Sequence, residues 1–88
     1  MQCAIYKSRK KQDAYLYLAN RDDFSGVPKP LLDMLGQPIY VMELDLTEER
    51  RLAREDPAEV LRNLRERGWH LQMPGQEEWP GFKPQPKH

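Results

Sequence analysis

Residues 3–18 read CAIYKSRKKQDAYLYL, and this stretch places two short alternating runs on either side of a basic link. In the first run Cys3 and Ile5 share one face, and in the second Leu16 and Leu18 do. Both runs are rich in residues that favour strands, and a link of about five residues is long enough for a hairpin loop. The stretch therefore predicts an N-terminal β-hairpin over residues 3–8 and 14–18.

The segment after the hairpin predicts a short helix and then a third strand. Pro28 suits the first turn of a helix, where its missing N–H has no cost, and Gly36 suits a left-handed position at the end. Residues 38–46 alternate as a strand. One face of it holds Tyr40, Met42, Leu44 and Leu46, and the other holds Ile39, Val41, Glu43 and Asp45.

Two positions have the chemistry to begin a second helix. Thr47 is a good N-cap and is followed by two glutamates, which the helix dipole favours. Residues 56–59, Asp-Pro-Ala-Glu, are the stronger signal because they combine an N-cap, a proline at the first helical position and a capping-box glutamate. Gly68 ends this helix, and residues 69–73 alternate as a fourth strand.

The length of 88 residues allows one domain, because two would each lack a core. Residues 74–88 read PGQEEWPGFKPQPKH and are too rich in proline and glycine for a helix or a sheet ladder. We therefore expect a folded domain over residues 1–74 and a mobile C-terminal tail over residues 75–88. Whether Trp79 and Phe82 dock on the domain, bind a partner or stay exposed is left open.

The element order is β-β-α-β-α-β, and three of the four strands carry apolar or aromatic residues on both faces. Strands of this kind need cover on both sides of the sheet. The sequence thus predicts an α+β fold, an α/β/α sandwich around a four-stranded, largely antiparallel sheet. It does not fix the strand order.

The chain resembles the YcgL-domain family of small bacterial proteins. The resemblance is carried by CAIYKS, YLYL, DDFSGVPKPLLDMLGQP, RLAREDPAEVLRNL and GWHLQMP, which together span about residues 3 to 74. It implies an α/β/α sandwich around a four-stranded sheet and a cytoplasmic origin in gammaproteobacteria. It implies no activity, cofactor or catalytic residue.

Composition excludes several classes of protein. Fourteen basic and fourteen acidic residues cancel, so no global charge draws the chain to nucleic acid or to an anionic membrane. Cys3 is the only cysteine, which excludes an internal disulfide and suits a reducing compartment. No signal peptide or long apolar run is present, so we expect a cytoplasmic protein without cofactor or metal.

The basic link is the strongest candidate for a binding site. Its four cations lie within residues 7–11 and have phosphate-binding chemistry, and nearby tyrosines can stack on unpaired bases. The alternative is a hairpin turn kept soluble by charge, with a tyrosine face that a helix covers. The partner-binding surface proposed from the sequence consists of Tyr6, Lys7, Lys10, Tyr15, Tyr17, Gln72 and Pro74, with Tyr6 joining the other two tyrosines across the hairpin.

Catalytic constellations are weak. Cys3 and His70 are the only pair that suggests a nucleophile and its base, and we interpret Cys3 as a core residue and His70 as facing away from the side of Trp69. Glu43 and Asp45 share a strand face, but no further cation ligand is suitably spaced. The sequence therefore leans away from an enzyme.

The functional hypothesis from the sequence is a small protein-binding or adaptor module whose partner is an unknown protein. The alternative is weak binding of single-stranded nucleic acid by the basic hairpin and its tyrosines. We expect a monomer that does not contact membranes.

Overall fold

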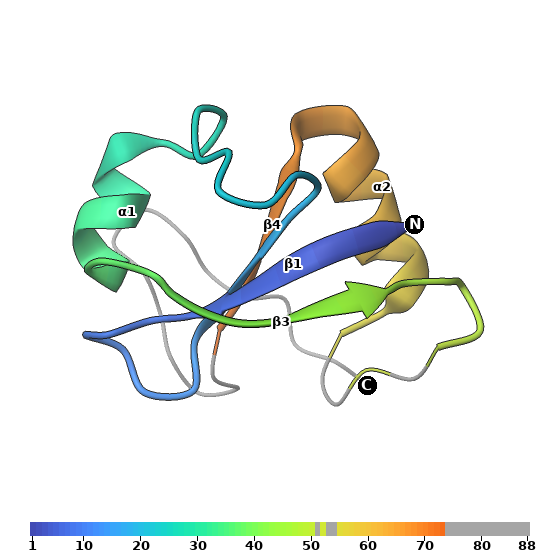
Figure 1. The fold of residues 1–88 in the computed structure, drawn as a ribbon, viewed down its shortest axis with the longest axis horizontal. Coiled ribbons are helices and arrows are strands. Elements are labelled where there is room, and N and C mark those ends of the chain that lie inside the picture. The colour runs from blue at the N-terminus through green and yellow to red at the C-terminus, as the bar shows by residue number, and fades with distance from the viewer. Residues whose placement is uncertain (51, 53–54, 74–88) are drawn as a thin grey trace.

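The predicted hairpin lies at the centre of a four-stranded antiparallel sheet. The structure, a computed structural model, describes residues 1–50, 52 and 55–73. Strand β1 (Gln2–Lys7) pairs with β2 (Tyr15–Leu18), and the order across the sheet is β3-β1-β2-β4 (Figure 1). Strands β3 (Ile39–Asp45) and β4 (Trp69–Gln72) form the two edges, each antiparallel to its neighbour. The predicted α+β class and element order are confirmed.

The two helices begin and end close to where the sequence predicts. Helix α1 (Lys29–Leu35) follows Pro28, and Gly36 ends it with a φ of 74°. Helix α2 (Pro57–Arg67) is capped by Asp56, whose side chain accepts a hydrogen bond from the Ala58 N–H over 3.0 Å. Gly68 closes α2 in the left-handed conformation, with its N–H donating to the carbonyl of Leu64.

Two hydrophobic clusters lie on the two faces of the sheet. One contains Leu16, Leu18 and Leu35, and thus joins β2 to α1. The other contains Cys3 and Tyr17 from the sheet together with Val60, Leu61 and Leu64 from α2. Both faces of the central strands are therefore covered, which is why β2 is apolar on both sides.

The prediction that Tyr6 shares a face with Tyr15 and Tyr17 is wrong. Tyr6 lies opposite Leu16 in the β1–β2 register, and Tyr17 lies opposite Ile5. Tyr6 therefore belongs to the α1 cluster and Tyr17 to the α2 cluster. The hairpin register, which the strand pattern alone did not fix, decides this.

The predicted alternation of β3 is also wrong at its start. Ile5 lies opposite Met42, but the next residue, Tyr6, lies opposite Tyr40, so Val41 is an extra residue in β3. This β-bulge reverses the alternation, and Tyr40 and Met42 lie on different faces. Tyr40 and Glu43 consequently share a face although they are three residues apart, because Glu43 lies opposite Ala4.

No helix begins at Thr47. The Arg50 N–H donates to the Thr47 carbonyl over 3.1 Å in an isolated turn, and the described helix starts ten residues later, at Pro57. Pro74 and the predicted tail over residues 75–88 lie outside the described residues. Neither of the described helices has the length and apolar character needed to cross a membrane.

Candidate functional site

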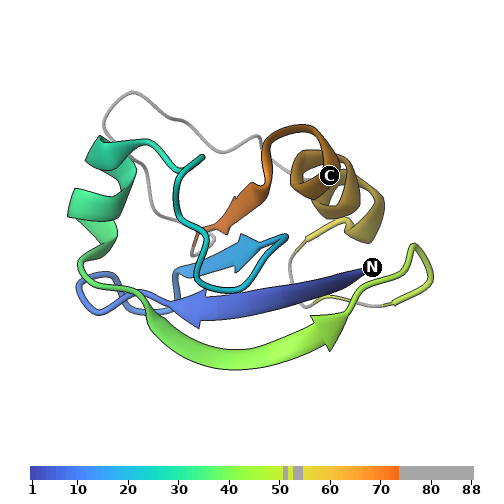
Figure 2. The ribbon, with the colours of Figure 1, turned by 45° about the horizontal axis from the view of Figure 1, so that its top comes forward.

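Strand β3, at the edge of the sheet, exposes three consecutive large apolar side chains, with Tyr40 on the α1 side of the sheet and Met42 on the α2 side. The exposed fractions are 36% for Tyr40, 44% for Val41 and 43% for Met42. Figure 2 shows β3 along the outer edge of the sheet, with β1 on its inner side and neither helix against its outer side. We call Tyr40, Val41, Met42 and Glu43 the β3 edge surface.

Charged groups flank this surface with opposite signs at its two ends. The Arg21 guanidinium stacks 3.9 Å above the centre of the Tyr40 ring, at the start of β3. Lys7, also at this end, lies opposite Ile39. Glu43 lies at the other end and is exposed, so the strand edge runs from positive to negative.

The end of β3 is anchored to the chain start. The N-terminal ammonium of Met1 lies 3.3 Å from a carboxylate oxygen of Asp45 and donates to the Leu46 carbonyl over 2.9 Å. The Leu46 N–H in turn donates to the Met1 carbonyl over 2.7 Å. The anchor partly neutralises Asp45, so Glu43 carries the negative end of the surface.

Two tyrosines of the predicted binding surface are core residues. Tyr6 is 2% exposed and Tyr17 is 4% exposed. The Tyr17 hydroxyl donates to Oε1 of Gln72 over 2.8 Å, and burial is the main cause that raises its pKa to about 12. Burial also raises the pKa of the Tyr6 hydroxyl. Neither ring face is open for stacking on a nucleobase.

The remaining residues of that predicted surface do not form one patch. Tyr15 and Gln72 are half-buried and face each other on the α2 side of the sheet, whereas Lys7 and Lys10 are exposed around the hairpin. The Lys10 ammonium donates to the Asp33 carbonyl over 3.2 Å, so it holds the hairpin turn beside α1. Pro74 lies outside the described residues.

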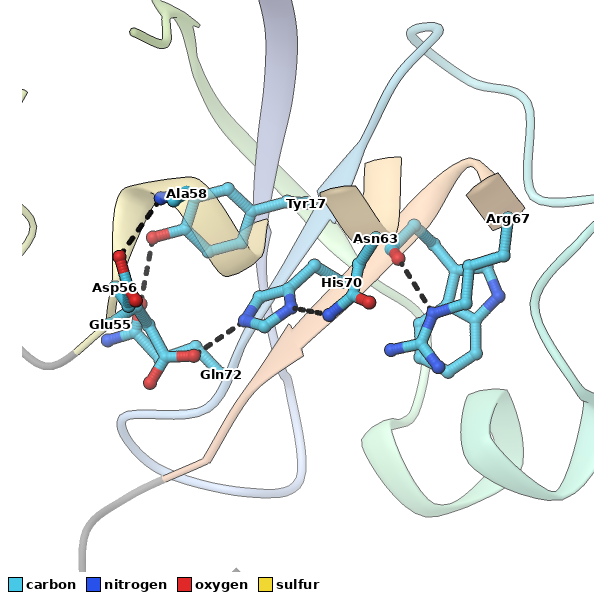
Figure 3. Close-up of polar contacts among 9 residues, drawn as sticks. Tyr17, Glu55, Asp56, Ala58, Asn63, Arg67, His70 and Gln72 are labelled. Carbon is cyan, nitrogen blue, oxygen red and sulfur yellow. Dashed lines mark hydrogen bonds and ion pairs between the residues drawn. The ribbon is translucent and has the colours of Figure 1, made fainter. Parts of the chain in front are cut away.

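His70 is the centre of a buried polar network (Figure 3). Its ring is 5% exposed; Nδ1 lies 2.9 Å from the side-chain nitrogen of Asn63, and Nε2 lies 2.5 Å from a carboxylate oxygen of Glu55. Both ring nitrogens are engaged by the protein, so this imidazole ties α2 and the segment before it to β4.

Cys3 lacks the surroundings of a nucleophile. It is 1% exposed within the α2 cluster, and burial is the largest cause that raises the pKa of its thiol. A reactive cysteine needs the opposite, a lowered pKa and access to solvent. The interpretation of Cys3 as a core residue agrees with its position.

Two hollows lie elsewhere on the described surface. The larger is an open groove of about 530 Å³ beside α1, lined by Lys10, Phe24, Leu32, Asp33, Gly36, Gln37 and Pro38. The smaller, of about 110 Å³, lies where α2 meets β4 and is lined by Asn20, Asp23, Ser25, Gly26, Val27, Arg67, Gly68 and Trp69. Arg67 stacks on Trp69 at 3.9 Å and donates to its carbonyl, so its guanidinium braces this turn.

No metal site is formed by the residues that the structure describes. Within them no three His, Cys, Asp or Glu side chains gather closely enough to hold an ion. Glu43 and Asp45, the predicted weak pair, are exposed on the edge strand, and Asp45 is engaged by the N-terminus.

Sequence reasoning missed the apolar part of the β3 edge surface. An alternating strand with Tyr40 and Val41 on opposite faces is typical of a strand covered on both sides, as β2 is. Only the position of β3 at the edge of the sheet leaves these residues exposed. The switch of one face from apolar to acidic at Glu43 was misleading, because it predicts that the strand leaves the core there, whereas residues 40–43 are exposed and the following Leu44 and Leu46 are buried.

Comparison with known proteins places this chain among small bacterial sequences. A family model described as the YcgL domain matches residues 3–75. A YcgL domain-containing protein of Thioalkalivibrio sulfidiphilus is 56% identical over 80 residues, which are 91% of this chain and 99% of that protein. A relative from Pseudomonas paraeruginosa is 51% identical over 78 residues, covering 88% of this chain and 80% of the relative. One from Actinobacillus succinogenes is 43% identical over 79 residues, 90% of this chain and 89% of the relative.

Proposed function

We propose that this chain, which belongs to the YcgL domain family, is a protein-binding module whose contact surface is the outer edge of β3. One observation carries the proposal. Three neighbouring large apolar side chains, Tyr40, Val41 and Met42, are exposed on a strand that is paired on one side only. Exposed apolar side chains on an open sheet edge favour association with another polypeptide.

The buried parts of the molecule support this role over an enzymatic one. Both nitrogens of His70 bond to neighbouring side chains, and the Cys3 thiol is enclosed by the α2 cluster. His70 and Cys3 thus stabilise the fold, and the exposed apolar side chains of β3 are available to contact a partner. A single enclosed thiol also fits a reducing interior, so we propose a cytoplasmic setting.

Affinity capture with a matched pair of variants tests the proposal. The wild-type protein, Val41→Lys and Lys29→Glu are immobilised and exposed to nuclease-treated lysate of the source bacterium at about 0.5 M salt, where surface charge is screened. Lys29 is exposed at the first position of α1, and α1 does not lie against the outer side of β3 (Figure 2).

We expect wild type and Lys29→Glu to retain the same polypeptide, and Val41→Lys to lose it. Hydrogen exchange of the recovered complex then locates the contact, with slower exchange in residues 39–45. An identical set of proteins on all three columns, together with a protein that stays monomeric in solution, contradicts the proposal, and so does protection of a recovered complex that leaves β3 unchanged.

The second candidate is weak binding of single-stranded nucleic acid by the basic turn. It is favoured by the exposure of Lys7, Arg9 and Lys10 at one end of the hairpin. With Tyr6 and Tyr17 in the core, only phosphate contacts support it, and such affinity falls steeply with salt. Fluorescence anisotropy of a labelled oligonucleotide at low salt, with Lys10→Glu as the comparison, decides it; no binding at low salt removes this candidate.

A further inference from the structure

We infer that the partner of the β3 edge surface is a second copy of this chain, which docks antiparallel to form a twofold-symmetric dimer. The inference rests on the proposed function and names its partner. It replaces the sequence-based expectation of a monomer. Three features of the edge, its charge order, its bulge and its exposed apolar residues, carry it.

The charge order along β3 is self-complementary in the antiparallel direction. Arg21 stands over Tyr40 at the start of the surface, and Glu43 lies at its other end. When a second copy is turned around, its Glu43 comes opposite Tyr40 and Arg21 of the first, and the reverse contact forms by symmetry. A parallel copy instead places like charges side by side, which is destabilising.

The β-bulge also favours a second copy of this chain as the partner. Because Val41 is an extra residue, Tyr40 and Glu43 lie on one face of the sheet at a spacing of three residues. A regular strand presents same-face side chains two residues apart, so it cannot match both positions at once. Another copy has the same irregular spacing. A twofold axis perpendicular to the sheet places the face that carries Tyr40 and Glu43 on the same side in both copies. Glu43 of each copy can therefore reach Tyr40 and Arg21 of the other.

The apolar residues supply the contact between the charged ends. Val41 and Met42 are 44% and 43% exposed, and in this antiparallel register Val41 of each copy lies opposite Met42 of the other, so that each shields the other from water. The surface is short, so the dimer is weak, with a dissociation constant on the order of 100 µM. An isologous contact of this kind closes on itself and leaves no further β3 edge open for growth.

Sedimentation velocity over protein concentrations from about 5 µM to about 1 mM tests the inference with the full chain. We expect the wild-type protein to shift from monomer to dimer across this range. Arg21→Glu and Glu43→Lys each place like charges across the contact, so each is expected to weaken the dimer about tenfold. The double variant restores opposite charges and recovers wild-type dimerisation to within about threefold.

The controls carry matched changes of charge at sites away from β3. Lys29→Glu and Glu66→Lys reverse the same charges on exposed helix positions and leave the dimer unchanged. Urea unfolding of every variant verifies that the fold is intact. A wild-type protein that remains monomeric at about 1 mM overturns the inference. So does a dimer whose dissociation constant is the same in both single variants as in wild type, or is not restored by the double variant.

Failure of this inference is separable from failure of the proposed function. If the chain is monomeric and the lysate capture still depends on Val41, the β3 edge binds a different protein, and only the identification of the partner as a second copy is wrong. If the chain is monomeric and the capture is also indifferent to Val41, both are wrong.

Discussion

The hydroxyl group of Tyr6 is held from two directions by one residue. It donates to Oδ1 of Asp22 over 2.9 Å and accepts from the Asp22 N–H over 2.8 Å. Asp22 has a φ of 67°, in the left-handed region that aspartate tolerates better than most residues. The phenol therefore fixes the loop between β2 and α1 against the sheet, and with it the neighbouring Arg21.

Tyr6→Phe removes both of these hydrogen bonds and keeps the packing of the ring. We expect the free energy of unfolding to fall by about 1 kcal/mol, measured by urea denaturation. Tyr15→Phe is the matched control, because no hydrogen bond of the Tyr15 hydroxyl is present among the described residues. Equal losses for the two variants would show that the bonds to Asp22 contribute nothing.

Tyr17 makes the protein sensitive to alkali. Its pKa is raised to about 12 in the folded chain, mainly by burial, so between about pH 10 and pH 12 the unfolded chain loses this proton while the folded chain keeps it. Stability therefore falls as the pH rises through this window, by at most about 3 kcal/mol from this group. The raised pKa values of Cys3 and Tyr6 act in the same direction.

Comparison with Tyr17→Phe isolates the contribution of Tyr17. Urea unfolding at about pH 9.5 and at about pH 11.5 should show a smaller alkaline loss for Tyr17→Phe than for wild type, because the groups that remain are common to both. Parallel losses in the two proteins would contradict the assignment. The lower starting stability of the variant, which also lacks the bond to Gln72, does not affect this comparison.

At the scale of single elements, Asp56 defines the start of α2. Its carboxylate accepts from the Ala58 N–H, one of the donors that the first helical turn leaves without a partner. Asp56→Ala is expected to lower the free energy of unfolding by about 1 kcal/mol. Glu66→Ala, at an exposed position of the last turn, should leave it within about 0.5 kcal/mol of wild type, and thermal or urea unfolding distinguishes the two.

The sequence predicted the elements well because their signals are local. The cap at residues 56–59 gave the start of α2 correctly, whereas Thr47 and its glutamates did not start a helix. Residues 48–50 have no apolar stripe to bury, and a cap without one does not stabilise a helix in isolation. The four strands were also found, because each alternates over its own length.

Register and strand order were beyond the sequence because they depend on contacts between distant residues. The face of Tyr6 follows from its pairing with Leu16, and the extra residue in β3 follows from a mismatch with β1 that only the assembled sheet contains. The candidate site depended on both features. It was therefore placed on the hairpin tyrosines, when the exposed apolar residues were those of the edge strand.

At the scale of the whole molecule, the balance of charge governs solubility. The net charge is zero at pH 7 and the isoelectric point is about 6.7, so mutual repulsion is weakest near neutrality. We expect the concentration soluble in polyethylene glycol to pass through a minimum near pH 6.7. Arg9→Glu should move this minimum to lower pH, and an unmoved minimum would mean that apolar contact, and not charge, limits solubility.

The enclosure of Cys3 has a practical consequence. It is the only sulfhydryl in the chain, and it sits between an interior strand and α2 with 1% of its surface exposed. An alkylating reagent can meet this sulfur only when the helix lifts from the sheet. The rate at which Cys3 is alkylated therefore measures how often α2 separates from the sheet.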